Sequence, residues 1–482
     1  MRIFLVLVFF PFSLFANFEL QQAHKQAYEQ IFRLRLGLAK DYLSKTKPEN
    51  AFTIYLNNYV FCVESLLSSD KKKYENFRKI EKESLKKIEK MTKNSPYFLF
   101  FQAEILMQGS FVRLYFEDQV EAAQDLKKAL KLLKENEEKY PNFLPNKKTL
   151  GALRVLISAV PQQHRWLTNF LGFKDDKAEK GIDQILQVAD SQDFFAFEAN
   201  LFYALLNCYL LDKAPEASDF LEKKFKNLGR EQQLYHFVAG LLAYKAQQPK
   251  QALWHLDKIV KSDYTADLPI VFYLKAECYL VTEKYEKSLI NYNNFLTYYK
   301  GKHYIKDCFY KMFVAYYVLE NQKYVVYYQL IPKRGSKTSF PDQYAQNFYE
   351  KKQFPNLQLL KARLLIDGGF SEKAYSFLDS LSEKNFTKKG EQLEYFYRKA
   401  RAAHQAKKTE IAVQLYKKTI AESANEKLYF APNAALQLGY IFIETQPKLA
   451  QTYFEKVFSY PDHEYKSSLD SKAKIALKFL EK

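Results

Sequence analysis

Apolar residues recur three or four positions apart along most of the chain, and this spacing predicts one amphipathic helix after another. Residues 71–94, KKKYENFRKIEKESLKKIEKMTKN, show the pattern: Tyr74, Phe77 and Ile80 share one face, and acidic and basic residues four positions apart occupy the others. Glycine and proline are scarce, so we expect an all-α fold with short joints. Residues 323–332, KYVVYYQLIP, could form a strand, but their helical flanks favour a helix.

Several predicted helix pairs share a pattern of small and large residues. A small residue is followed by a second about twelve positions later and by a large residue four positions after that. A helix hairpin that stacks on copies of itself needs small side chains where its two helices cross. The residues that fit are Gly240, Ala252 and Leu256; Ala276, Ser288 and Tyr292; Ala362, Ala374 and Leu378; Ala400, Ala412 and Tyr416; and, one residue shorter, Gly439, Ala450 and Phe454.

These positions resemble those of the tetratricopeptide repeat, an antiparallel helix pair that stacks into a right-handed α-solenoid. The resemblance covers about residues 201–461, although the units are longer than the usual ~34 residues and aromatic residues and alanine replace most Trp and Gly signature positions. It implies a concave groove that binds a protein or peptide partner. The residues that the repeat register points into this groove are Phe237, Leu241, Tyr244, Tyr273, Glu277, Arg363, Tyr397, Arg401 and His404.

Residues 160–181, VPQQHRWLTNFLGFKDDKAEKG, combine several residue types that are rare elsewhere in the chain. We interpret this window as a structural joint, in which proline ends one helix, glycine caps another and an aspartate begins the next. The alternative, His164 as a catalytic base oriented by Asp175 or Asp176, lacks a nucleophile and a set of metal ligands. The residues assigned to the joint are Pro161, Trp166, Gly172, Asp176 and Gly181.

A second resemblance covers about residues 95–190. The segment GALRVLISAVPQQHRWLTNFLGFKDDKAEKGIDQIL is similar to tetratricopeptide proteins related to the yeast inclusion-body clearance factor. The richness in Tyr, Phe, Lys and Asn also resembles exported tetratricopeptide proteins of Bacteroidetes-type bacteria. Both resemblances imply an adaptor without catalytic residues or cofactors. The positions that carry the first are Gly151, Pro161, Leu167, Gly172 with Phe173, Asp175 with Asp176, and Gly181.

The chain begins MRIFLVLVFFPFSLFAN, a basic residue followed by a short apolar run, which is the order of a secretory signal peptide cleaved after Ala16. An uncleaved anchor is the alternative, but the run is too short for a spanning helix of ~20 residues. We therefore expect export to the periplasm, or to the periplasmic face of an outer membrane, without an integral membrane span. The predicted parts are a signal peptide (1–16), an N-terminal helical region with divergent repeats (17–190), tetratricopeptide-like repeats (191–464) and a C-terminal capping helix (465–482).

Charge and reactive residues narrow the possible functions. The formal net charge of +18 could attract anionic polymers, but the lysines are dispersed over helix faces, which favours ordinary solvated surfaces. The four cysteines lie in apolar helical contexts and are expected to be buried free thiols; a bridge between Cys278 and Cys308 is the alternative. Seven scattered histidines and the absence of known motifs predict no metal site. His236 and His255 could meet across a hairpin, but no third ligand is evident.

These observations predict a non-enzymatic, exported scaffold that organises a cell-envelope complex by binding a protein or peptide partner in its groove. No cofactor and no nucleic acid partner are expected. The first alternative is an electrostatic binder of an anionic envelope polymer or lipid head groups. The second is a hydrolase with a degenerate site at His164. Salt separates the scaffold from the electrostatic binder, because charge-driven binding weakens steeply as ionic strength rises.

Overall fold

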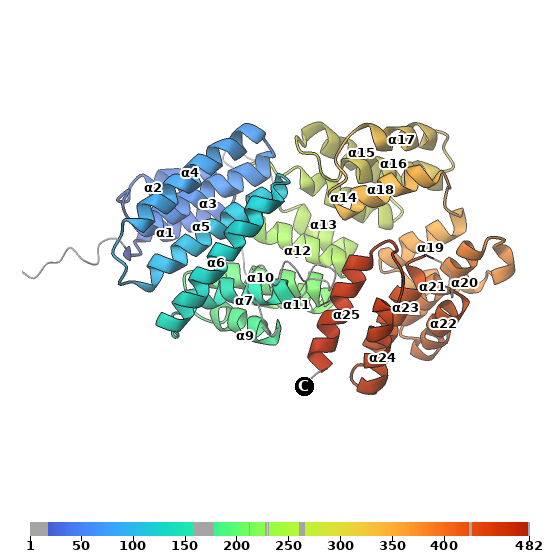
Figure 1. The fold of residues 1–482 in the computed structure, drawn as a ribbon. Coiled ribbons are helices and arrows are strands. Elements are labelled where there is room, and N and C mark those ends of the chain that lie inside the picture. The colour runs from blue at the N-terminus through green and yellow to red at the C-terminus, as the bar shows by residue number, and fades with distance from the viewer. Residues whose placement is uncertain are drawn as a thin grey trace, which may run out of the picture. The chain divides into compact units, whose positions relative to one another are not determined.

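The computed structural model describes residues 18–158, 178–211, 213–226, 229, 231–259, 266–423 and 427–480. Over these residues the chain forms helices joined by turns and contains no strand, so the predicted all-α fold is confirmed. Successive helices pair as antiparallel hairpins, as a tetratricopeptide-like solenoid requires (Figure 1). None of the described helices is long and apolar enough to span a membrane.

The chain divides into two compact units. The first comprises Met1–Leu150, Gln192–Phe194 and Lys261–Asp267, and the second comprises Gly151–Ser191, Phe195–Val260 and Leu268–Lys482. Residue 190, where the sequence suggested a boundary between two regions, therefore lies inside the second unit. Helix α7 (Leu144–Ser158) begins in the first unit and ends in the second.

Helices α3 (Ala51–Ser68), α4 (Lys71–Glu89) and α5 (Pro96–Tyr115) of the first unit begin at polar side chains that cap them. Asn50 accepts a hydrogen bond from the backbone N–H of Phe52 at 2.8 Å, and Asp70 accepts one from Lys72 at 2.7 Å. Pro96 follows the capping residue Ser95, where its missing N–H costs nothing. The unit also contains α1 (Gln22–Phe32), α2 (Leu36–Leu43) and α6 (Gln119–Lys139).

The second unit contains the predicted repeats. Its helices are α9 (Ala178–Ala189), α10 (Ala196–Leu210), α11 (Ala214–Lys224), α12 (Gln233–Lys245), α13 (Pro249–Leu256), α14 (Ile270–Val281), α15 (Tyr285–Tyr298), α16 (Ile305–Val318), α17 (Tyr324–Leu330), α18 (Phe340–Lys351), α19 (Leu357–Asp367), α20 (Ser371–Asp379), α21 (Lys389–Gln405), α22 (Thr409–Glu422), α23 (Phe430–Phe442), α24 (Pro447–Phe458) and α25 (Lys466–Leu480). Hairpins α12/α13, α14/α15, α19/α20, α21/α22 and α23/α24 carry the repeated residues.

The repeated small residues lie where the helices of each hairpin cross. A Cβ atom on Gly240 would come within 2.9 Å of the Leu256 side chain, and one on Gly439 would meet the Phe454 ring at 2.4 Å. In the next hairpin, the Ser288 hydroxyl donates to the carbonyl of Ala276 at 2.8 Å, and both residues are fully buried. The small residues therefore set the close approach of paired helices, as their spacing predicted.

Three expectations outside the repeats can be compared with the structure. Residues 324–330 form α17 rather than a strand, although Val325 and Val326 are exposed and the helix is less buried than expected. All four cysteines are buried and free, so the bridge between Cys278 and Cys308 is not formed. The last helix, α25, buries Leu469, Ala473 and Ala476 but contacts α9 and α10 as well as α23 and α24. The end of the second unit thus packs against its beginning.

Candidate functional site

Two adjacent pockets lie on the inner side of the second unit, each with a volume of about 700 Å³. We name the first the tyrosine pocket; its lining includes Phe237, Leu241, Tyr244, Tyr273, Glu277, Tyr310, Lys311 and Tyr344. We name the second the basic pocket; its lining includes Lys245, Asp367, Tyr397, Arg398, Arg401, His404, Lys407 and Lys472. Both pockets share Lys245, Gln247, Arg363, Asp367, Arg401, Tyr465 and Ser468.

A close contact between distant turns brings the walls of these pockets together. Gly369 has φ of +79°, and a Cβ atom there would lie 2.4 Å from the carbonyl oxygen of Gln247. The Gln247 side chain in turn donates to the carbonyl of Ile366 at 2.9 Å. Only glycine tolerates both this backbone conformation and this approach. The turn after α19 therefore docks on the turn after α12, and the first helices of several hairpins face one another.

All nine residues predicted to face a groove line these two pockets. Phe237, Leu241, Tyr244, Tyr273 and Glu277 lie in the tyrosine pocket. The other predicted residues are Tyr397 and His404, which line the basic pocket, and Arg363 and Arg401, which line both. The repeat register thus placed side chains from α12, α14, α19 and α21 in one region.

The residues assigned to the joint are mostly outside the described part of the chain. This applies to Pro161, Trp166, Gly172 and Asp176, and also to His164. Gly181 is described and lies in α9, where a Cβ atom would come within 2.6 Å of the Gly151 carbonyl oxygen in α7. The two glycines therefore lie at a close crossing of α7 and α9.

Glu277 is the centre of a buried hydrogen-bond network in the tyrosine pocket. Its carboxylate accepts from the Tyr244 hydroxyl at 2.8 Å, from Lys311 Nζ at 2.9 Å and from the hydroxyl of Tyr292. Burial alone would raise the pKa of Glu277, but the charge of Lys311 and the three hydrogen bonds lower it below its usual value. Glu277 therefore carries a negative charge at neutral pH, which Lys311 balances.

Asp307, one turn before Lys311 on α16, behaves differently. Burial raises the pKa of Asp307 to about 6, Lys311 opposes this rise, and the charge of Glu277 adds to it. Tyr273 donates its hydroxyl to Asp307, and the carboxylate of Asp342 accepts the backbone N–H of Asp307 at 3.1 Å. One lysine thus faces two buried carboxylates, of which one is easily protonated.

The basic pocket holds its arginines in partial ion pairs. Asp367 lies 3.5 Å from Arg363 Nε and 3.4 Å from a terminal nitrogen of Arg401. Arg363 also donates to the hydroxyl of Tyr344 at 3.1 Å, and its guanidinium lies 5.4 Å from the centre of that ring. Arg401 keeps most of its five N–H donors unused in these contacts. Both guanidinium groups are positioned to bind a further acceptor.

Positive charge is concentrated in the basic pocket. Its lining contains six basic side chains, Lys245, Arg363, Arg398, Arg401, Lys407 and Lys472, and one carboxylate, that of Asp367. Burial lowers the pKa of Lys245; Cys208 and the charge of Glu277 oppose this shift, and the charges of Lys311 and Lys472 add to it. Burial likewise lowers the pKa of His404, together with the charges of Lys407 and Arg401. His404 therefore responds to the positive charge around it.

Lys245 and Lys472 were not predicted as site residues. Lys245 follows Leu241 by four positions, so it lies on the same face of α12 as a residue that was predicted. That spacing could have identified it. Lys472 lies in α25, which was interpreted as a cap, and no local pattern indicated that α25 would return to α10.

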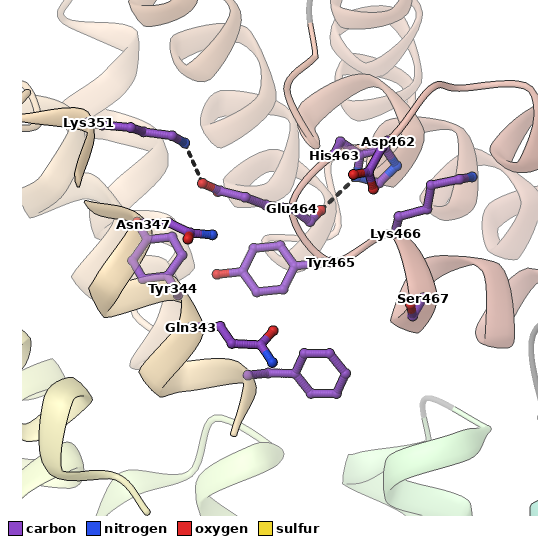
Figure 2. A pocket seen from close by; sticks show the side chains of 11 residues that line it. Gln343, Tyr344, Asn347, Lys351, Asp462, His463, Glu464, Tyr465, Lys466 and Ser467 are labelled. Carbon is purple, nitrogen blue, oxygen red and sulfur yellow. Dashed lines mark hydrogen bonds and ion pairs between the residues drawn. The ribbon is translucent and has the colours of Figure 1, made fainter. Parts of the chain in front are cut away.

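A third pocket, of about 390 Å³, lies outside the first two, and we name it the outer pocket (Figure 2). It lies between α18 and the segment before α25, which Lys351 and Glu464 connect by an ion pair of 2.5 Å. Tyr344 and Tyr465 point toward one another with ring centres 6.1 Å apart. Tyr465 lines all three pockets and therefore forms part of the wall between them.

The histidines do not form a metal site among the described residues. His236 and His255 meet across the α12/α13 hairpin with their Nδ1 atoms 3.1 Å apart, and Glu222 contacts His255 Nε2. Burial lowers the pKa of His236 to about 4, and the neighbouring His255 lowers it as well. No group of three or more potential ligands suited to a metal ion occurs in the described part of the chain.

Comparison with known proteins adds little to this picture. No family model matches the chain. No curated protein matches it. Among solved structures, the human IFIT1 dimer with PPP-AAAA is similar over 85% of this chain and 97% of its own, at 12% identity and a TM-score of 0.36. A Rap protein complexed with competence and sporulation factor is similar over 83% of this chain and 97% of its own, at 11% identity and a TM-score of 0.33. Scores this low carry no argument for a shared ligand.

Proposed function

We propose that this chain is a non-enzymatic binding scaffold whose second unit receives an extended segment of a partner protein in the tyrosine and basic pockets. The observation that carries the proposal is the convergence of nine groove-facing side chains from four helices on two connected pockets. Each pocket has the volume of a typical ligand site, and the shared wall makes them continuous. A chain segment can occupy both, whereas a small metabolite would fill only one.

The side chains in these pockets are of the kinds that dominate binding energies at protein interfaces. Tyrosine and arginine provide large contact areas together with a hydrogen-bonding end, and both are enriched at binding hot spots. Tyr273, Tyr244 and Glu277 are held by the buried hydrogen-bond network, so little conformational entropy is lost when a ligand packs on them. The site is therefore largely formed before a partner binds.

The cellular setting is part of the same proposal. The order of residues at the start of the chain supports export, and we place the scaffold in a complex at the cell envelope. The described residues contain no helix suited to spanning a membrane. A fusion of residues 1–40 to a reporter enzyme that is active only after export tests this part; activity and cleavage after Ala16 are expected, and an inactive, uncleaved fusion would contradict it.

A second candidate function is electrostatic binding of an anionic envelope polymer or lipid head groups. It is favoured by the net charge of +18 and by the basic pocket. Most other lysines, however, are spread over exposed helix faces together with acidic residues, as on α4. Binding to an extended polymer surface would weaken by orders of magnitude between low and high salt, whereas binding within the pockets would change less.

The test is a selection of short peptides from a random library on the purified chain, followed by fluorescence anisotropy with the peptides obtained. We expect Leu241→Arg together with Arg401→Glu to weaken binding by at least tenfold, because the first fills the tyrosine pocket with charge and the second reverses a charge in the basic pocket. The control is Lys284→Glu with Lys417→Glu, at two exposed positions on outer helices.

Circular dichroism and melting curves establish whether each variant folds. If no peptide is selected, or if the selected peptides bind the folded pocket variant as well as the wild type, the pockets are not the partner site. Polymers such as lipopolysaccharide that bind only at low salt would support the electrostatic function instead.

A further inference from the structure

We propose that the basic pocket is an anion subsite that binds neighbouring carboxylates of an acidic stretch within the partner segment. This inference rests on the proposed function and specifies the chemistry of its ligand. The partner segment would place aromatic or apolar residues in the tyrosine pocket and acidic side chains in the basic pocket.

The first argument is the imbalance of charge in the lining. Three of its basic side chains, Lys245, Arg401 and Lys472, come from three different helices, α12, α21 and α25. Among the described residues of the lining Asp367 is the only carboxylate, and Arg363 and Arg401 share it. A ligand that brings negative charge would therefore gain favourable Coulomb interactions with the excess of basic side chains in this lining.

The second argument concerns Lys245 itself. It forms no ion pair within the described residues, and its Nζ atom lies 5.6 Å from the centre of the Tyr209 ring. Its side chain remains accessible to solvent although protein surrounds it. The positive charges of Lys311 and Lys472 act on it, and Glu277 opposes them through its charge without forming an ion pair with Lys245. A carboxylate bound here would relieve this repulsion.

The third argument is the start of α11. Ala214 and Pro215, the first residues of this helix, line the basic pocket. The one acidic residue among the described residues of this lining is Asp367. The N-terminal end of a helix carries a partial positive charge, which adds to that of the lysines and arginines. Backbone and side-chain charge thus have the same sign in this pocket.

The distribution of charge favours several linked carboxylates over one compact anion. The basic groups are spread around about 700 Å³, so a single phosphate cannot contact all of them. The tyrosine pocket contains the buried carboxylates Glu277 and Asp307, which disfavour acidic side chains there. The two pockets together therefore orient a segment whose two ends differ in charge.

The experiment compares two synthetic peptides with blocked termini. One has two phenylalanines and an alanine followed by three glutamates, and the other has glutamines in place of the glutamates. Blocked termini ensure that only side-chain carboxylates are tested. By isothermal titration calorimetry in 100 mM salt we expect the glutamate peptide to bind at least tenfold more tightly. Inorganic tripolyphosphate serves as a compact anion for comparison.

Variants locate the effect. The pair Lys245→Gln and Lys472→Gln should remove at least three quarters of the tenfold preference for the glutamate peptide over the glutamine peptide. The matched control, Lys284→Gln and Lys417→Gln, removes two exposed charges elsewhere and should keep the preference. Raising salt to 400 mM should reduce the preference in the wild type, because screening shortens the range of the charges.

The outcomes separate the two proposals. Equal binding of both peptides would overturn the anion subsite and leave the proposed function standing, whereas binding of neither, together with a failed peptide selection, would overturn the function. A preference that survives Lys245→Gln with Lys472→Gln would place the acidic contact elsewhere and overturn the assignment. A further outcome is that tripolyphosphate binds more tightly than the glutamate peptide and loses this binding in the same variant. That result would identify the ligand as a compact anion and would overturn the proposal of linked carboxylates.

Discussion

In the first unit, Arg113 donates to both carboxylate oxygens of Glu81, at 2.9 and 2.7 Å, and the two side chains are 9% and 3% exposed. In the second unit, Lys245 lies in an open pocket, forms no ion pair among the described residues and is close to other cations. In the first arrangement a carboxylate of the protein balances the arginine charge. In the second the lysine charge is left for a ligand to balance. A charged side chain thus serves packing at Arg113 and is available for binding at Lys245.

The strongest way to break this comparison is to remove one member of the closed pair. Arg113→Met leaves Glu81 buried without its bidentate partner, and such a change typically costs about 3–5 kcal/mol. The double variant with Glu81→Met should recover part of that loss, because two apolar side chains pack without a desolvation penalty, whereas Asp125, 3.1 Å from Arg113, still loses its partner. Urea unfolding of both variants measures the effect, and hydrogen exchange localises it to α4 and α5. Equal stability of the single variant and the wild type would show that the pair contributes nothing.

A second contrast is the acid sensitivity of the first unit. His24 is fully buried, with Nδ1 accepting the backbone N–H of Gln21 at 3.0 Å and Nε2 lying 2.9 Å from Thr53 Oγ1. Burial lowers the pKa of His24 to about 4, so the folded state takes up this proton less readily than the unfolded chain, whose histidines titrate near 6.5. Stability is therefore fully present above pH 6.5 and is lost as the pH falls from there to about 4, by about 3 kcal/mol.

Unfolding in urea at pH 7 and at pH 4.5 measures this loss, and His24→Gln should reduce it. The variant would be less stable than the wild type at neutral pH, but the glutamine side chain has no proton to gain. A variant whose stability falls between the two pH values as steeply as that of the wild type would assign the acid sensitivity to other groups.

The third prediction has the opposite sign and concerns the tyrosine pocket. Because burial raises the pKa of Asp307 to about 6, the folded state binds its proton more tightly than the unfolded chain does. The contribution of Asp307 to stability thus falls as pH rises from about 4 to 6. Asp307→Asn keeps an oxygen for Tyr273 and removes the charge, so we expect a gain of about 1 kcal/mol at pH 7 that disappears near pH 4. Melting curves at both pH values check it, and destabilisation at pH 7 would contradict the direction.

Much of the fold and of the candidate site follows from local pattern. The spacing from Gly240 to Ala252 and from Ala276 to Ser288 recurs because each hairpin makes the same crossing, and it also fixes which face of each first helix points inward. A repeat therefore lets sequence reasoning place groove residues that are more than a hundred positions apart, such as Phe237 and Arg401. The same logic applied to residues 71–94 found the solvated faces, since Glu75 and Lys79 are exposed.

What could not be predicted depends on contacts between distant segments. Glu81 lies among those solvated charges in sequence, but Arg113 of the neighbouring α5 buries it. Lys472 faces the basic pocket only because α25 packs against α10. This contact depends on the summed rotations of all the hairpins between these two helices. The partners of Glu277 on α12 and α16 likewise could not be predicted from the sequence of its own helix, α14. Small errors in each hairpin angle accumulate along a solenoid, so such contacts require the three-dimensional structure.

The smallest expected effect sharpens the comparison most directly, because it separates stability from binding at one residue. Burial lowers the pKa of Lys245, and the nearby cations Lys311 and Lys472 add to this shift while Glu277 opposes it. At neutral pH it is protonated at a cost to the folded state, so Lys245→Gln should leave stability unchanged or raise it by up to about 0.5 kcal/mol, the range of an exposed charge interaction. The same change should weaken binding of the glutamate peptide. Removing Arg113 does the reverse, since it destabilises the first unit without touching a pocket of the second. A loss of stability in Lys245→Gln would mean that Lys245 serves packing after all, and the contrast between closed and open charges would no longer hold.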